Sequence, residues 1–263
     1  MSRLKDKIVL ITGASSGLGA QIAFQAAERQ AVVVLTARRR DPLETAAKRC
    51  QELSGRAVYT YQLDVGSTEQ ISEVMQKIAV EVGPVDVLVN NAGFGLFAEA
   101  LDTPTSITEE MFRVNVLGLI HITKLTALRM TKRGSGHIIN IASQAGKMAT
   151  PKSAVYAATK FAVRGYSNAL RLELRPFGIY VTTVNTGPMH TNFFNQADPT
   201  GSYLNKIARW VLDPQVVAKK VTACMLTDTR EINLPRIMEI GARLYVMFPR
   251  IGDYLAGGLF NRK

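Results

Sequence analysis

The stretch Lys7-Ile-Val-Leu-Ile-Thr-Gly13-Ala-Ser-Ser-Gly17-Leu-Gly19 decides the fold of this chain. A short apolar run ends in three glycines spaced G-x3-G-x-G, and a candidate helix follows. Glycine permits the tight turn and the close backbone approach that a phosphate group requires at the start of a helix. The stretch therefore predicts a strand, a phosphate-binding turn and a helix. A purely structural glycine turn is the alternative interpretation.

Short apolar runs alternate with longer amphipathic segments along the rest of the chain, without repeats, low-complexity segments or linkers. Most of the runs are rich in valine and isoleucine, as in parallel strands that are buried on both faces. The predicted strands are 7–12, 32–36, 57–63, 85–89, 136–141, 179–184 and 231–234; the predicted helices are 17–29, 41–54, 67–82, 108–132, 153–176 and 213–227. The alternation predicts an α/β fold: one doubly wound Rossmann-type domain over residues 1–263, with a parallel sheet of about seven strands flanked by helices.

Composition narrows the class of protein further. The 263 residues carry a net charge of +11, but the basic residues are scattered and no nucleic-acid recognition motif accompanies them. No signal peptide is expected, and no uncharged apolar stretch reaches the roughly 18 residues of a membrane span. Cys50 and Cys224 lie far apart, which favours a reduced, cytoplasmic protein. The three histidines do not cluster with other ligands, so no metal site is expected.

The end of the second predicted strand indicates which dinucleotide binds. A site specific for NAD usually has an acidic residue about 20 positions beyond the glycines, where it binds the ribose 2′-hydroxyl. Here no acid precedes Ala37, and Arg38, Arg39 and Arg40 follow it. A guanidinium binds a 2′-phosphate through paired charged hydrogen bonds, whereas a carboxylate repels it. We therefore predict NADP(H); a solvated basic loop is the alternative.

Tyr156 and Lys160 lie four residues apart in a predicted helix, on one face. A free tyrosine has a pKa of about 10, so proton transfer at neutral pH needs a neighbour that favours the phenolate, and a lysine ammonium does so. Ser143, thirteen positions before Tyr156, is placed to hydrogen-bond a carbonyl oxygen. Alternatively, Tyr156 packs its ring and Lys160 covers a surface, because an isolated Y-x-x-x-K pattern occurs by chance.

Taken in order, these motifs resemble the short-chain dehydrogenase/reductase (SDR) family over about the first 235 residues. Thr12-Gly-Ala-Ser-Ser-Gly-Leu-Gly19 corresponds to the family's cofactor turn, Leu63-Asp-Val65 to its adenine-binding element and Asn90-Asn-Ala-Gly93 to its central-strand motif. Asn185-Thr-Gly-Pro-Met-His-Thr191 is similar to the loop after the sixth strand, with Thr186 in place of the usual proline.

The resemblance implies an NADP-dependent oxidoreductase that transfers hydride between the cofactor and a carbonyl or alcohol group. It implies the catalytic residues Asn115, Ser143, Tyr156 and Lys160, with Asn115 anchoring a water relay or stabilising a helix irregularity. The implied cofactor-binding residues are Gly13, Ser15, Ser16, Gly17, Leu18, Gly19, Arg38, Arg39, Asp64, Val65, Asn91, Ala92, Gly93, Tyr156, Lys160, Gly187 and Thr191. Asp64 is alternatively a turn or cap residue. A homodimer or homotetramer formed through the two long helices is also implied.

Two segments bear on the substrate and partners. The substrate-lid segment 188–212 and the loops before it carry a largely apolar and aromatic set that predicts a lipophilic carbonyl or alcohol substrate: Phe94, Phe97, Met148, Met189, His190, Phe193, Phe194, Tyr203 and Trp210. A lid that packs on its own domain is the alternative interpretation. The C-terminal apolar and basic extension 235–263 has Arg236, Arg243 and Arg250 at seven-residue intervals, and Pro249 should interrupt any single helix there. Packing against a pocket or a second subunit is the favoured interpretation of this extension; contact with an anionic membrane surface is the alternative.

Two other functions remain open. A 3-oxoacyl-[acyl-carrier-protein] reductase would present basic residues such as Arg129 and Arg171 to an acidic carrier. A noncatalytic dinucleotide-binding redox sensor would not need Ser143, Tyr156 and Lys160. The physiological substrate, the reaction direction and the stereochemistry do not follow from the residues.

Overall fold

The structure is a computed structural model that describes residues 2–148, 150–198 and 211–259. Its centre is a seven-stranded sheet in the order β3-β2-β1-β4-β5-β6-β7, in which every pairing is parallel. The strands are β1 (Ile8–Thr12), β2 (Val32–Ala37), β3 (Val58–Gln62), β4 (Val87–Asn90), β5 (Gly136–Ile141), β6 (Ile179–Thr186) and β7 (Glu231–Leu234). The predicted doubly wound Rossmann-type fold is confirmed, because the strand order reverses direction between β1 and β4.

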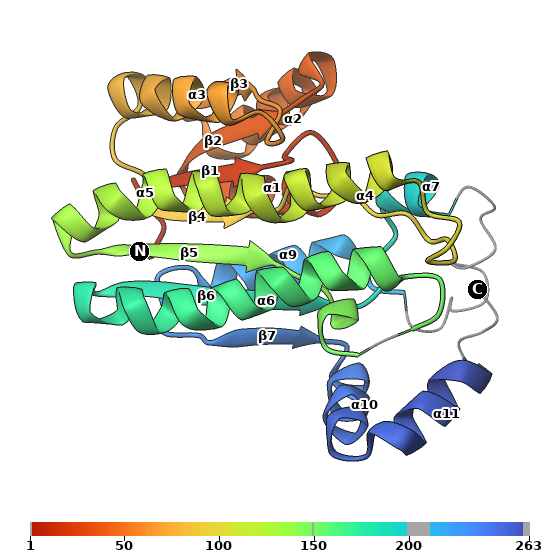
Figure 1. Cartoon of the computed structure of the whole chain (residues 1–263). Coiled ribbons are helices and arrows are strands. Elements are labelled where there is room, and N and C mark those ends of the chain that lie inside the picture. The colour runs from red at the N-terminus through yellow and green to blue at the C-terminus, as the bar shows by residue number, and fades with distance from the viewer. Residues whose placement is uncertain (1, 149, 199–210, 260–263) are drawn as a thin grey trace.

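Helices cover both faces of the sheet (Figure 1). Along β1, Val9 and Ile11 point into one buried apolar cluster while Leu10 points into another. The first cluster includes residues of α1 (Gly17–Glu28), α2 (Arg40–Ser54) and α9 (Pro214–Cys224). The second includes residues of α3 (Thr68–Glu81), α5 (Leu119–Arg133) and α6 (Ala154–Leu174). Burial on both faces explains why the strands lack polar alternation.

The predicted helix 108–132 begins earlier and is interrupted. It consists of α4 (Thr105–Phe112), a π-helical turn η1 (Arg113–Gly118) and α5. The combined segment is the one described helix long and apolar enough to cross a membrane, but 56% of its most apolar window is buried inside the protein. Packing on the sheet therefore accounts for its apolar character.

Three α-helices within the described residues were not predicted: α7 (Phe193–Ala197), α10 (Arg236–Met247) and α11 (Pro249–Leu259). The predicted interruption at Pro249 is confirmed, since α10 ends before it and α11 begins with it, a position that proline favours. These two helices follow β7 and extend from one corner of the sheet (Figure 1). Ala242 faces the protein, whereas most large apolar residues of the two helices, and Phe248 between them, are exposed. Those of the helices are Ile237, Ile240, Leu244, Val246, Met247, Ile251, Tyr254 and Leu255.

Three ionisable groups, two thiols and one imidazole, are buried in the core. Cys50 on α2 and Cys224 on α9 are free and buried, and burial raises their pKa values to about 12 and about 11. His137 on β5 is fully buried, and burial lowers its pKa to about 3. The backbone N–H of Leu226 donates to His137 Nδ1 at 2.8 Å, so Nε2 carries the proton and donates to Thr182 Oγ1 at 2.8 Å. His137 is therefore a neutral imidazole inside the sheet.

Arg171 on α6 does not present its charge to the surface as expected, because only 9% of the residue is exposed. It donates to the carbonyl of Val181 at 2.8 Å and to Thr183 Oγ1 at 3.1 Å. The expectation that Arg171 is available to an acidic carrier protein was wrong. A backbone carbonyl and a threonine hydroxyl of β6, together with the carbonyl of Arg230, accept its hydrogen bonds instead.

Candidate active site

The motifs that are far apart in the sequence meet at the carboxyl ends of the strands. Gly13 follows β1, Arg38 follows β2, Asn91 follows β4, Ser143 comes shortly after β5 and Gly187 follows β6. A continuous cavity of about 340 Å³ is lined by all five of these residues and by Tyr156 and Lys160 on α6. Ligands of open parallel sheets bind at this edge, in the crevice where the strand order reverses. The cavity is therefore the candidate active site.

The glycine turn is held in a shape that only small residues allow. Gly13 and Gly17 have φ angles of 65° and 56°, in the left-handed region that favours glycine. A Cβ atom on Gly19 would lie 2.4 Å from the carbonyl oxygen of Gly13. Asn91 fastens the turn from the neighbouring strand, because its Nδ2 donates to the carbonyl oxygens of Thr12 and Gly13 at 2.9 and 3.1 Å. The turn opens α1 and leaves Ser15, Ser16, Gly17 and Leu18 on the cavity wall.

The far end of the cavity, beyond this turn, is basic. Arg38 and Arg39 are exposed and line it, whereas Arg40 does not and instead begins α2. Asp64 and Val65 line the cavity beside them. Asp64 is also a turn residue, since its Oδ1 accepts a hydrogen bond from Gly66 N at 2.8 Å. Asp64 is therefore a turn residue, as one interpretation of the sequence has it, and its contact with the adenine stays a prediction.

Tyr156 and Lys160 lie one turn apart on α6, and both are nearly buried, at 8% and 6% exposed. The ammonium nitrogen of Lys160 lies 5.7 Å from the centroid of the Tyr156 ring and donates to the carbonyl of Ile141 at 3.0 Å. Burial lowers the pKa of Lys160 to about 8. An ammonium has three donors, so two remain for a ligand beyond the described contact with Ile141. The surface-covering alternative for Lys160 is wrong.

Ser143 starts the short 3₁₀ turn η2 (Gln144–Gly146). Its Oγ accepts from Ala145 N at 3.1 Å and donates to the carbonyl of Thr186 at 3.3 Å, which joins η2 to the end of β6. Thr186 replaces the usual proline of this loop and forms the last residue of β6, paired with Leu234. Ser143 thus lines the cavity from the start of a turn that is tied to the end of β6.

Asn115 lies inside the π-helical turn η1 and is 1% exposed. Its side chain accepts from Phe94 N at 3.0 Å and donates to Phe94 O at 2.8 Å, and it also donates to Thr159 Oγ1 at 3.2 Å. A Cβ on Gly93 would lie 3.0 Å from Asn115 Oδ1 and 3.7 Å from Lys160 Nζ. The Asn115 side chain therefore fixes the backbone after β4 next to Lys160. Its place within η1 agrees with the expected helix irregularity.

The remaining wall is apolar, as the sequence predicts for the substrate side. It is formed by Phe94, Phe97, Met148, Met189, Phe193 and Phe194. The Tyr156 ring lies against two of them, with centroid distances of 6.0 Å to Phe97 and 5.6 Å to Phe193. His190 is exposed and does not line the cavity, and Tyr203 and Trp210 lie outside the described residues. The sequence did not single out Met238 on α10, which also lines the cavity.

A loop closes over the glycine turn from the other side. Gly187 N donates to the carbonyl of Leu234 at 2.6 Å, so the loop after β6 is tied to the end of β7. A Cβ on Gly17 would lie 3.3 Å from the side chain of Thr191. Gly187 and Thr191 thus line the cavity opposite the first turn, as predicted.

Comparisons with known proteins agree with this geometry. A family model described as short chain dehydrogenase matches residues 7–201. The chain belongs to this family. It is 36% identical over 219 residues to an uncharacterized oxidoreductase of Staphylococcus saprophyticus, covering 83% of this chain and 91% of that protein. It is 34% identical over 258 residues to 17-beta-hydroxysteroid dehydrogenase 13 of Homo sapiens, covering 97% of this chain and 82% of that protein.

A solved structure of the family is also similar. It is a short-chain dehydrogenase from Sphingobium yanoikuyae in complex with NADPH, with a TM-score of 0.79, 28% sequence identity and coverage of 92% of this chain and 95% of that chain. Members of the SDR family are oxidoreductases that bind a nicotinamide dinucleotide. The residues of this SDR fit such a cofactor: the turn has no room for a Cβ atom at Gly13 or Gly19, and the cavity extends from Arg38 to Lys160.

Proposed function

We propose that this SDR is an NADPH-dependent carbonyl reductase, or in the reverse direction an alcohol dehydrogenase, for a lipophilic small molecule. One observation supports this most strongly: a single cavity joins the basic end at Arg38 to Tyr156 and Lys160, and aromatic and methionine side chains form the wall beyond them. An apolar wall with a few converging polar groups is typical of a site for a small organic substrate.

The roles of the residues follow from their positions. Bound NADPH supplies the hydride that the carbonyl carbon accepts. Tyr156 donates its phenolic proton to the carbonyl oxygen, which completes the alcohol. Ser143 fixes the same oxygen beside the phenol when its hydroxyl, which donates to the carbonyl of Thr186 in the free protein, turns to donate to the substrate. Lys160 favours the phenolate through its charge, and its two remaining donors would hold the nicotinamide ribose hydroxyls. Asn115 holds the backbone at Phe94 and thereby the wall next to Lys160.

Substitution of Tyr156 by Phe tests the mechanism. We expect Tyr156→Phe to lower kcat for NADPH-dependent reduction of a lipophilic ketone by about 10²- to 10⁴-fold, the usual contribution of acid–base catalysis. Tyr166→Phe is the matched control, because Tyr166 lies on the same helix and does not line the cavity. The substrate itself can be sought in a carbonyl and alcohol screen that follows NADPH absorbance. Unchanged turnover in Tyr156→Phe would refute the mechanism.

Arg38 and Arg39 support the preference for NADP(H) over NAD(H). Loss of charged hydrogen bonds to a 2′-phosphate should weaken NADPH binding by about tenfold to a hundredfold in Arg38→Ala, while NADH binding changes little. Arg40→Ala is the control, since Arg40 is exposed but outside the cavity. Titration of both variants with both cofactors decides the matter, and equal losses for NADPH and NADH would argue against recognition of the 2′-phosphate.

Other functions receive less support. The buried guanidinium of Arg171 removes one of the two basic residues that favoured an acyl-carrier-protein reductase. A redox sensor without catalysis does not require Ser143, Tyr156 and Lys160 in one cavity, yet all three line it. Comparing turnover of free and carrier-bound ketones separates the first alternative from our proposal.

We further propose a cytoplasmic homo-oligomer. SDR enzymes are commonly oligomeric, and the two long helices carry exposed apolar residues for a subunit contact: Leu128 on α5, and Phe161 and Leu172 on α6. Analytical ultracentrifugation of Leu172→Glu tests this contact, and cell fractionation tests the location. The expected packing of residues 235–263 against a second subunit and their contact with an anionic membrane both stay predictions. Flotation of the protein with anionic vesicles distinguishes them.

A further inference from the structure

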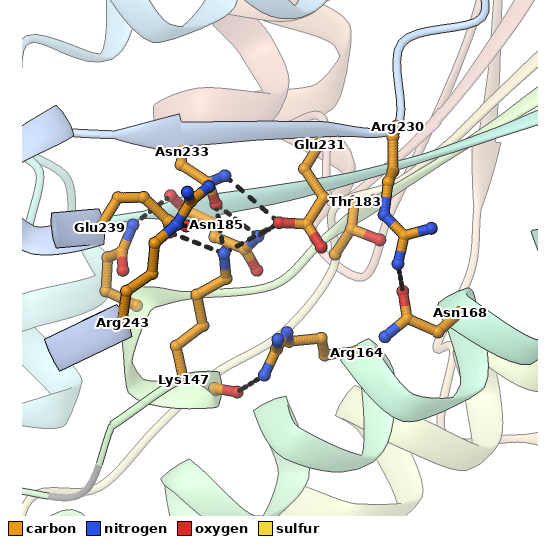
Figure 2. A network of polar contacts seen from close by, with 12 residues as sticks. Lys147, Arg164, Asn168, Thr183, Asn185, Arg230, Glu231, Asn233, Glu239 and Arg243 are labelled. Atoms are coloured by element: carbon orange, nitrogen blue, oxygen red, sulfur yellow. Dashed lines mark hydrogen bonds and ion pairs between the residues drawn. The ribbon is translucent and has the colours of Figure 1, made fainter. Parts of the chain in front are cut away.

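Lys147 lies close to the candidate active site but does not line the cavity. It follows the turn η2 and is only 6% exposed. Its ammonium nitrogen lies 2.8 Å from Glu231 Oε2, 2.8 Å from Asn233 Oδ1 and 2.7 Å from Glu239 Oε2. All three of its donors are thus satisfied by side chains of β7 and α10 (Figure 2).

The partners of Lys147 are themselves bonded to each other. Asn185 at the end of β6 donates to Asn233 Oδ1 at 2.8 Å, and Asn233 donates to Glu231 Oε2 at 3.2 Å. Burial by itself would raise the pKa of Glu231, but the hydrogen bonds from Lys147 and Asn233 lower it overall. Glu239 is held on its other oxygen by Arg243 at 2.9 Å. We call Lys147, Glu231, Asn233 and Glu239 the Lys147 clamp.

The clamp joins two parts of the cavity wall. Met148, the residue after Lys147, and Met238, the residue before Glu239, both line the cavity. Ser143 lies at the start of the same turn that Lys147 ends, and the backbone N–H of Lys147 donates to the carbonyl of Gln144 at 2.9 Å. A shift of Lys147 relative to Glu239 therefore moves Met148, Met238 and the turn that bears Ser143.

An apolar contact would hold these elements together at least as stably, because burying charges costs desolvation energy that an ion pair only partly recovers. The charged cluster adds a defined geometry. Because the Lys147 ammonium donates to three fixed side chains, η2, β7 and α10 can take only one arrangement relative to each other. A fixed arrangement of these elements is useful beside Met148 and Met238, because methionine side chains are flexible and adapt to many shapes.

We propose that Lys147 is a positioning residue that determines substrate specificity, acting through Glu231 and Glu239 to fix Met148 and Met238 in the substrate wall. This inference rests on the proposed function for its substrate side. The glycine turn and Arg38, at the nucleotide end of the cavity, belong to other elements that carry no residue of the clamp.

Three variants test the clamp. Lys147→Met removes the charge and keeps the length of the side chain, Glu239→Gln keeps the shape and removes one charge, and Lys147→Arg keeps the charge. Lys7→Met is the matched control, because Lys7 pairs with Asp86 at 3.8 Å near the start of β1, at the opposite end of the strands. The assays are kcat and KM for a small and a bulky ketone, and the Kd for NADPH.

For Lys147→Met and Glu239→Gln we expect KM for the bulky ketone to rise about tenfold, and the ratio of kcat/KM between the two ketones to change at least tenfold. The Kd for NADPH should stay within twofold of the wild type. Lys147→Arg should restore part of the specificity, and Lys7→Met should change neither ratio. An unchanged ketone ratio in folded Lys147→Met and Glu239→Gln would overturn the proposal; if Lys147→Met does not fold, the ratio in Glu239→Gln decides alone.

A measurement without turnover separates this inference from the proposed function. In Glu239→Gln, hydrogen–deuterium exchange should become about tenfold faster in both 144–148 and 236–247, because one ion pair holds the two segments. Faster exchange in 236–247 alone would overturn the clamp. A wild-type protein that reduces no ketone would overturn the proposed function, and the exchange result would still decide whether the clamp joins the two segments.

Discussion

Acid should destabilise this SDR through His137, at a pH where most carboxylates are still ionised. The folded protein holds His137 neutral, with its pKa lowered to about 3 by burial, whereas the unfolded chain protonates it at about 6.5. Between these values the unfolded state binds one more proton, so the free energy of unfolding falls as the pH falls. The stability is fully present above about pH 6.5 and is lost progressively below it.

The expected loss is about 1.4 kcal/mol for each pH unit below 6.5, which gives about 2 kcal/mol at pH 5.0. For a chain of this size, 2 kcal/mol corresponds to a decrease in Tm of about 4–8 °C. Urea unfolding followed by circular dichroism at 222 nm, at pH 7.5, 6.5, 5.75 and 5.0, measures this dependence. The window ends at pH 5.0 because carboxylates contribute increasingly below it.

The control is His137→Asn, whose Oδ1 can still accept from Leu226 N but which carries no titratable ring. This variant is expected to be less stable at pH 7.5, because the hydrogen bond to Thr182 Oγ1 is lost. Its free energy of unfolding should nevertheless vary about 2 kcal/mol less than that of the wild type between pH 7.5 and 5.0. Equal slopes for the two proteins would show that His137 is not the titrating group, and the reasoning from burial would fail.

Three further outcomes are expected. Gly118→Ala should destabilise the protein by about 3 kcal/mol in urea unfolding, because its Cβ would lie 2.0 Å from the carbonyl oxygen of Val65; a loss below 1 kcal/mol would mean that η1 shifts freely. Gly165→Ala on α6 has nothing within 4 Å of the new Cβ and should instead stabilise by about 0.5–1 kcal/mol through helix propensity, measured in the same way. For NADPH-dependent reduction, kcat/KM should fall about tenfold per pH unit above pH 8, where Lys160 loses its charge; a rate that stays level to pH 9.5 would contradict this role.

The sheet and the catalytic groups could be predicted because their signals are local. Each strand is a short apolar run, and every run that the sequence predicted as a strand forms one, with ends displaced by two residues or fewer. Gly13, Ser143, Tyr156 and Lys160 belong to compact motifs whose place relative to a strand or helix end follows from the sequence. Parallel pairing then brings these motifs to one edge.

The Lys147 clamp could not be predicted, because its signal is not local. Lys147 lies 84 residues before Glu231 and 92 before Glu239, and each is an ordinary charged residue in its own segment. The burial of Arg171 could not be predicted for the same reason, because its guanidinium donates to the backbone carbonyl of Arg230, 59 residues away. Such pairings depend on which loops the completed sheet brings together.

The helices α10 and α11 were missed for a different reason. Their apolar residues recur at helical spacing, but the sequence pattern predicts only an apolar and basic extension interrupted at Pro249, without assigning helices to it. Met238 is the residue of α10 that reaches the cavity, and no pattern in the extension distinguishes it from its neighbours. The π-helical turn η1 is hidden in a similar way, since one additional residue hardly alters a helical apolar pattern.

The two buried thiols can report when the helices that carry them separate from the sheet. Cys50 and Cys224 sit on different helices, α2 and α9, within one apolar layer, and burial keeps both protonated at neutral pH. A thiol reagent reacts with the thiolate and needs access, so neither side chain can be labelled until its helix separates from the sheet. Mass spectrometry of the two labelled peptides would then give two opening rates. Equal rates mean that the layer opens as one cooperative unit, and unequal rates identify the helix that leaves first.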